Sequence, residues 1–154
     1  MEHHHHGRPS LNRLAASATT HCMTGCAIGE VLGLVIASVA GWGTAASIAV
    51  AVGLAFTFGY TLTMLPLLRA GIAFSTAAGL AFAADTASIT VMEIVDNAIM
   101  LVVPGAMQAG LGTALFWGSL GVGLGVAWVA AFPVNRWLIG QGWGHAKVHA
   151  HHGH

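Results

Sequence analysis

Four of the five acidic side chains in this sequence lie inside long apolar segments, and every arginine and lysine lies outside those segments. The four acids are Glu30, Asp85, Glu93 and Asp96. A carboxylate in the hydrocarbon of a membrane costs about 3 kcal/mol or more, and such residues usually face a bundle interior and mark an ion or proton path. Without a neighbouring base, each acid must be protonated, hydrogen-bonded to neutral groups, or neutralised by a bound cation.

Composition places the chain among integral membrane proteins. Of its 154 residues 56% are hydrophobic and 6% are charged, whereas a soluble domain has about 25% charged residues. Hydropathy predicts four spans, at residues 19–41, 45–68, 74–103 and 114–132, each close to the roughly 20 residues that cross a bilayer. We therefore expect an all-α, integral membrane four-helix bundle. Its parts would be a His-containing cytoplasmic segment (1–18), a four-span transmembrane domain (19–139) and a His-rich cytoplasmic tail (140–154), with no cleavable signal peptide.

The positions of the basic residues predict the topology. Arg8 and Arg13 precede the first span, Arg69 lies between the second and third, and Arg136 and Lys147 follow the fourth. The other two loops carry no charge. The positive-inside rule therefore puts both termini and the middle loop in the cytoplasm.

The two predicted hairpins resemble each other, which indicates an internal parallel repeat. Glu30-Val31-Leu32 matches Glu93-Ile94-Val95, and the Pro-x-x-Arg pattern at 66–69 matches that at 133–136. Apolar sequence of low complexity also matches itself by chance. In a true parallel repeat, Glu30 and Glu93 would face each other across an axis along the membrane normal.

Chemically active side chains form stripes at helical spacing. Cys22, Cys26 and Glu30 repeat every four residues and share one face of the first helix, with His21 beside them. One face of the third helix carries Asp85, Met92, Glu93, Asp96 and Met100, and the second helix carries Thr57, Tyr60, Thr61 and Met64. The three stripes predict a shared polar interior.

Our leading expectation is that this interior binds, and transports or buffers, a soft transition-metal cation. Thiolates and thioethers favour Cu(I), imidazoles suit copper, zinc and nickel, and carboxylates broaden the range. Histidines at both ends, His3 to His6 and the cluster from His145 to His154, add a compositional metal-binding signal, although the first run is also the pattern of an expression tag. Cu(I) is the preferred ion, ahead of zinc and nickel. The predicted metal ligands are His21, Cys22, Cys26, Glu30, Asp85, Met92, Glu93 and Asp96.

Other interpretations stay open. Buried cysteines commonly serve as small apolar packing residues, Met92 is a common core filler, and the glycines of the fourth span are typical of close helix packing. Carboxyl groups alone suit a proton-coupled transporter or channel, and a structural subunit would use the acids across an oligomer interface. Each of these hypotheses predicts a homo-oligomer in a lipid bilayer. The sequence offers no catalytic pair and no nucleotide-binding loop, so we expect neither an enzyme nor a nucleic-acid partner.

Three motifs carry a resemblance to a known family. They are the stretch from His21 to Glu30, the segment from Ala84 through Glu93 to Asn97, and the run Phe132-Pro133-Val134-Asn135-Arg136-Trp137. Together they resemble a bacterial family of small, uncharacterised membrane proteins, a domain of unknown function. The resemblance implies a multi-pass helical protein with a His-rich end and a link to copper handling. It implies no established activity. We expect the protein in the bacterial inner (plasma) membrane.

Overall fold

Four long helices make up the fold, as predicted. The computed structural model describes residues 10–142, so the histidine runs at both ends of the chain lie outside the described residues. The helices are α1 (Leu11–Ala40), α2 (Thr44–Arg69), α3 (Phe74–Val102) and α4 (Ala114–Gly140), with a short 3-10 turn, η1 (Ala106–Gln108), before α4. All four are long and apolar enough to cross a bilayer. The chain is thus a multi-pass membrane protein with four spans.

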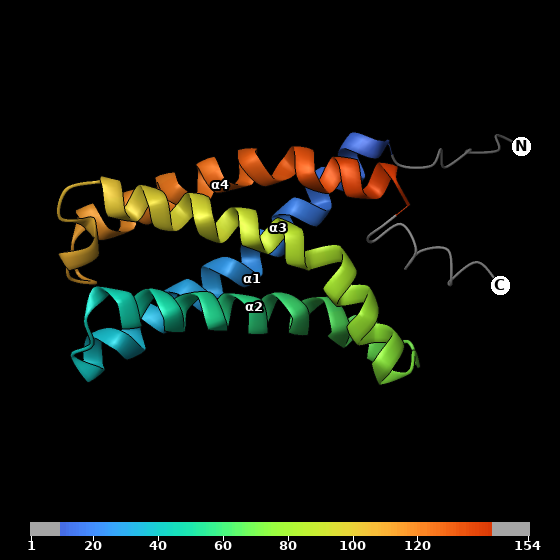
Figure 1. Cartoon of the computed structure of the whole chain (residues 1–154), viewed down its shortest axis with the longest axis horizontal. Coiled ribbons are helices and arrows are strands. Elements are labelled where there is room, and N and C mark those ends of the chain that lie inside the picture. The colour runs from blue at the N-terminus through green and yellow to red at the C-terminus, as the bar shows by residue number, and fades with distance from the viewer. Residues whose placement is uncertain (1–9, 143–154) are drawn as a thin grey trace, which may run out of the picture.

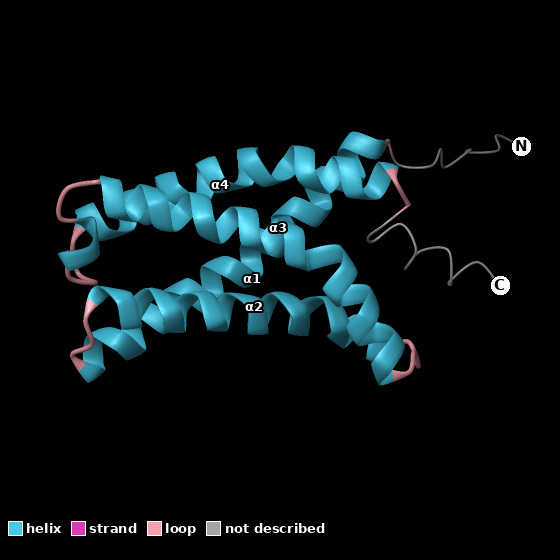
Figure 2. Cartoon of the chain, viewed as in Figure 1, coloured by secondary structure: helices cyan, strands magenta, loops and turns pink. Residues whose placement is uncertain are grey.

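Helices α1 and α3 cross in the middle of the bundle, and α2 and α4 lie on opposite sides of that crossing (Figures 1 and 2). Both α1 and α3 run from the end of the bundle where α1 begins and α4 ends, which we call the terminal end, to the opposite end, which we call the loop end. The α1–α2 turn and the η1 connection lie at the loop end, and the α2–α3 turn lies at the terminal end. This arrangement fits two parallel copies of one hairpin, although the repeat itself stays a prediction.

The predicted breaks between spans coincide with the observed turns. Gly41, Gly71 and Gly105 have φ values of 68°, 81° and 80°. These values lie in the left-handed region, which residues with a Cβ atom rarely adopt. At the terminal end, however, α1 begins eight residues before the predicted span and α4 ends eight residues after it. The extra turns pair with each other, because Arg136 Nε donates to Asn12 Oδ1 at 2.7 Å. Hydropathy detects the hydrocarbon-embedded part of a helix and not such polar ends.

A run of glycines brings α1 against α2. A Cβ added to Gly25 would overlap Gly59, one added to Gly29 would overlap the backbone of Ala55, and one on Gly33 would overlap Ala51. Small residues four apart let two membrane helices approach closely enough for backbone-to-backbone packing. The glycines of the fourth span were expected to pack closely against another helix, but most of them do not. There only Gly123 meets a neighbour, and a Cβ on Gly118, Gly121 or Gly125 would meet open space within the described chain.

The predicted polar stripe of α2 does not line the interior. Thr57 and Thr61 are exposed and donate their hydroxyls to the carbonyls of Gly53 and Thr57, one turn earlier in the same helix. Such bonds let a threonine face lipid without an unsatisfied hydroxyl. The buried face of α2 is instead made of small residues and Leu67: Ser47, Ala51, Ala55, Gly59, Thr63 and Leu67. The interpretation of this stripe as part of the shared interior was therefore wrong for both threonines.

The orientation of the bundle in the membrane is a prediction that labelling can test. We expect a cysteine introduced at exposed Gln108, at the loop end, to react with an impermeant thiol reagent in intact cells. A cysteine at exposed Ser10, at the terminal end, should be protected until the cells are opened. Serine at positions 22 and 26 removes the background thiols. The reverse labelling pattern would place the terminal end and its basic residues outside.

Candidate functional site

The four acids of the spans are all buried inside the single chain. Asp85 is fully buried, and Glu30, Glu93 and Asp96 keep only 2%, 4% and 3% of their surfaces exposed. Helices of the same chain therefore cover them, and no oligomer interface is needed to remove them from lipid. The basic side chains among the described residues, Arg13, Arg69 and Arg136, are exposed near the helix ends. The acids thus share an interior that holds no fixed positive charge within residues 10–142.

Three pairs of side chains connect α1 with α3 along the crossing. Cys22 donates its thiol to Asp85 Oδ1 at 3.5 Å. One turn further along α1, Cys26 faces Glu93 as a hydrogen-bonding partner. Another turn on, Glu30 and Asp96 face each other in the same way. Because α1 and α3 run in the same direction, the stripes at i, i+4 and i+8 on α1 meet successive acids of α3. We call these three pairs the acid column.

The Glu30–Asp96 pair is the most unusual part of the acid column. Two carboxyl groups form a hydrogen bond only when at least one of them carries a proton. Glu30 Oε2 and Asp96 Oδ1 are buried and accept no hydrogen bond from the described residues. A bond between the two groups therefore requires a shared proton, and their unused acceptor oxygens suit a site that takes up and releases a small cation.

A glycine of α4 makes room for this pair. A Cβ built on Gly123 would overlap the carboxylate of Asp96, so only glycine at this position lets Asp96 lie against the α4 backbone. This contact explains why Gly123 is buried while Gly118, Gly121 and Gly125 are exposed. Any larger residue at 123 would force the Asp96 carboxylate to move.

Neutral polar groups extend the acid column toward the terminal end. Asn135 of α4 donates its amide to Thr19 Oγ1 at 2.9 Å and to Ser88 Oγ at 2.8 Å. Ser88 in turn faces Cys22 as a hydrogen-bonding partner. Thr19, Ser88 and Asn135 are all buried, and buried groups of this kind are costly unless they are bonded to each other. They form a hydrogen-bonded link from the column toward the terminal end.

Toward the loop end, an apolar layer separates the acid column from a cavity. The layer consists of Met100, Phe116 and Leu120, with Val31 and Leu34 packed against them. Beyond the layer lies a cavity of about 340 Å³ between the α1–α2 turn and the η1 connection. Polar side chains, Ser38, Ser47 and Gln108, line this cavity together with Trp42, Leu34 and Phe116. Leu34 and Phe116 thus belong both to the apolar layer and to the cavity wall.

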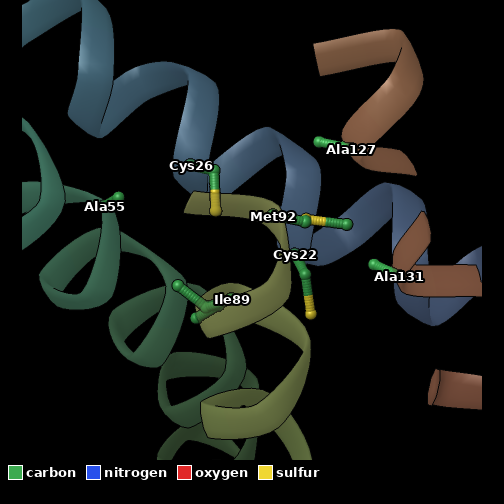
Figure 3. Close-up of a cluster of buried hydrophobic side chains, with 7 residues drawn as sticks. All are labelled: Cys22, Cys26, Ala55, Ile89, Met92, Ala127 and Ala131. Atoms are coloured by element: carbon green, nitrogen blue, oxygen red, sulfur yellow. The ribbon is translucent and has the colours of Figure 1, made fainter. Parts of the chain in front are cut away.

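The structure divides the predicted metal ligands between different surroundings. Cys22, Cys26, Glu30, Asp85, Glu93 and Asp96 belong to the acid column. His21 lies on another face of α1, where its Nε2 is 3.2 Å from Thr63 Oγ1 of α2. Met92 is buried beside the cysteines but extends toward Ala127 and Ala131 of α4 (Figure 3). Within residues 10–142, no three His, Cys, Asp or Glu side chains are arranged to hold one metal ion. The set of eight ligands therefore does not form one site here, and metal binding by a subset stays a prediction.

Three buried residues of the site were not predicted from the sequence. Thr19 and Ser88 are common in helices and carry no special signal. Asn135 lies beyond the predicted end of the fourth span at residue 132, where an amide is expected to meet water. Ser88 lies three residues after Asp85, so helical spacing places it on the acidic face of α3. This spacing was the one signal in the sequence that Ser88 belongs to the site.

Comparison with known proteins assigns the chain to a family and leaves the activity open. No curated protein and no solved structure matches the chain. A family model described as a domain of unknown function, DUF4396, matches residues 11–144, which include all four helices. The chain belongs to this family, the DUF4396 domain family.

Proposed function

We propose that this protein carries protons across the membrane through the acid column, either alone or in exchange for another solute. The observation that supports the proposal best is the Glu30–Asp96 pair, two buried carboxyl groups that face each other and keep unused acceptor oxygens. Intramembrane carboxyl groups without a basic partner commonly serve as proton relays. Neutral residues would make purely structural contacts between helices at a lower free-energy cost of burial.

The proposed route uses the side chains in the order in which the helices present them. From the terminal end a proton would reach the acid column past the hydroxyls of Thr19 and Ser88, which the Asn135 amide holds in place. From the Glu30–Asp96 pair it would reach the loop-end cavity through the apolar layer of Met100, Phe116 and Leu120. Apolar constrictions of this kind control conduction by excluding water. Transfer across the layer therefore requires that Leu34 or Phe116 move.

Proton flux into sealed liposomes tests the proposal directly. Purified protein in liposomes should dissipate an imposed pH gradient faster than protein-free liposomes do, provided that a potassium ionophore removes the membrane potential. If the rates are equal under this condition, free proton conduction is excluded. Flux that appears only when a second solute is supplied would identify an exchanger.

A soft metal ion is the second candidate for the transported cation. One observation favours it: Cys22 and Cys26 are both free thiols, and they lie one turn apart in the acid column. Thiolates are soft ligands that favour Cu(I). In the present arrangement each thiol faces a carboxyl group, so a metal would have to replace both pairings and release their protons.

Removing both thiols tests the metal candidate. In protein from which both His-rich ends have been removed, Cu(I) should bind with a stoichiometry that falls to zero when Cys22 and Cys26 are both replaced by serine. Binding should also weaken as the pH falls, because protons compete for the thiolates. Replacing Thr57, an exposed residue outside the column, with serine is the matched control. Unchanged Cu(I) binding by the double variant would leave the two cysteines as packing residues.

A further inference from the structure

Asn135 lies between two hydroxyl groups on the terminal-end side of the acid column. Its amide nitrogen donates to Thr19 Oγ1 at 2.9 Å and to Ser88 Oγ at 2.8 Å, and all three residues are buried. The hydroxyl of Thr19 gives its single proton to the Ala15 carbonyl at 2.8 Å. The Thr19 oxygen can therefore only accept from Asn135, which requires that the NH2 group of the amide, and not its oxygen, faces the hydroxyls.

On the other side of the amide, the hydrogen bonds lead into the acid column. Ser88 faces Cys22 as a hydrogen-bonding partner, and Cys22 donates its thiol to Asp85 Oδ1 at 3.5 Å. Since the Ser88 oxygen accepts from Asn135 and Cys22 gives its proton to Asp85, the Ser88 proton is directed at the Cys22 sulfur. The donors on this side thus all point from Asn135 toward Asp85.

Asn135 also lies close to the water-facing end of α4. The next residue, Arg136, is exposed and donates to the exposed Asn12 at 2.7 Å, and α4 ends at Gly140. A charged side chain near a helix end lies at the membrane interface and not in hydrocarbon. Asn135 therefore stands at the boundary between the water-facing end of the bundle and the buried acid column.

We propose that Asn135 interrupts proton transfer between the terminal end and the acid column. A hydroxyl or a carboxyl group can accept one proton and give up another, whereas the NH2 group of a neutral amide only donates. Asn135 thus holds Thr19 and Ser88 in place without letting a proton pass from one hydroxyl to the other.

The inference rests on the proposed proton function and specifies its mechanism. The column is closed at the loop end by the apolar layer and at the terminal end by the Asn135 amide. A proton from the terminal end reaches the column only when Asn135 moves away from the two hydroxyls. The protein is then a carrier that opens the column by a movement of its helices, and not a channel with a continuous proton path.

Exchange of thiol hydrogen for deuterium tests the inference without any transport. The chain has two cysteines, Cys22 and Cys26, and both belong to the acid column. The infrared S–H stretching band of the full-length protein in detergent therefore reports on the column alone, and in heavy water it should disappear slowly. Asn135→Asp keeps the shape of the side chain and supplies a group that accepts and donates protons, so it should speed the loss of the band at least tenfold. Asn135→Ser supplies a smaller group of the same kind and should also speed it, which decides the question if the buried acid prevents folding.

Two further variants distinguish a proton block from a structural contact. Asn135→Leu has nearly the size of asparagine, loses both hydrogen bonds and cannot relay a proton, so it should not speed the exchange. Asn12→Asp is the matched control, because it makes the same chemical change at an exposed residue of α1 near the terminal end; it should exchange like the parent. If folded Asn135→Leu exchanges as fast as Asn135→Asp, the amide only holds the helices together and the inference is wrong.

The outcomes separate this inference from the proton function. Proton flux in liposomes, together with an S–H band that disappears as quickly in the parent as in Asn135→Asp, would refute the block and leave the proton route intact. Faster exchange in Asn135→Asp, when neither the parent nor the variant carries protons into liposomes, would keep the block and refute the transport function. Faster exchange in the variant and proton flux in the parent would support both.

Discussion

Replacing Gly29 with leucine should abolish correct folding. A Cβ at this position would overlap the backbone of Ala55, and backbone atoms of two packed helices cannot move aside as a flexible side chain can. Overpacking a well-packed interface typically costs about 1–3 kcal/mol, and direct backbone overlap belongs at or above the upper end of that range. We expect most of the variant protein to aggregate in size-exclusion chromatography, and any remaining monodisperse protein to unfold at a clearly lower temperature.

The control for this substitution is Gly53→Leu. Gly53 lies in the middle of α2, and a Cβ added there would meet open space. The two variants therefore make the same change in composition and in helix propensity but differ in what the new side chain meets. Gly53→Leu should fold like the parent. If Gly29→Leu is equally stable, α1 and α2 do not pack as the structure has them, and the positions of Cys22, Cys26 and Glu30 relative to α3 would also be in doubt.

The sequence was sufficient to predict the four helices and the chemical character of the interior. The apolar segments and their glycine breaks are strong, local signals. The face shared by Cys22, Cys26 and Glu30 follows from helical spacing alone, and these residues do meet the acids of α3. Which acid each of them meets was not predictable, because the vertical offset between α1 and α3 depends on packing. The repeat suggested that Glu30 faces Glu93, whereas Asp96 is the hydrogen-bonding partner of Glu30 and Glu93 faces Cys26.

Other sequence predictions were wrong because helical spacing shows which residues share a face of a helix, but not which neighbouring helix that face contacts. His21 is adjacent to Cys22 in sequence, yet a step of one residue turns it toward Thr63 of α2. Thr57 and Thr61 share one face of α2, but that face is turned to lipid because the small residues of the opposite face fit against Gly25, Gly29 and Gly33. The spacing of these three glycines, four residues apart, was present in the sequence and indicates which face of α1 packs closely.

Replacing Glu30 with glutamine should leave the protein folded and abolish proton flux. Glutamine has nearly the shape of glutamic acid and keeps a donor for Asp96, but it has no proton to exchange. Removing a buried ionisable group also removes the cost of its charged form. We therefore expect thermal stability equal to or above that of the parent, together with a rate of pH-gradient collapse in liposomes that falls to the rate of protein-free vesicles.

Asp96→Asn removes the other carboxyl group of the pair and should cause the same loss of proton flux. Thr57→Val is the matched control, because it removes a polar group from a membrane helix without touching the acid column, and it should conduct like the parent. If the Glu30 and Asp96 variants both retain flux, the pair is not part of the proton route. If they lose their fold instead, the two acids hold the helices together, and the proton that they share stabilises the bundle and does not move through it.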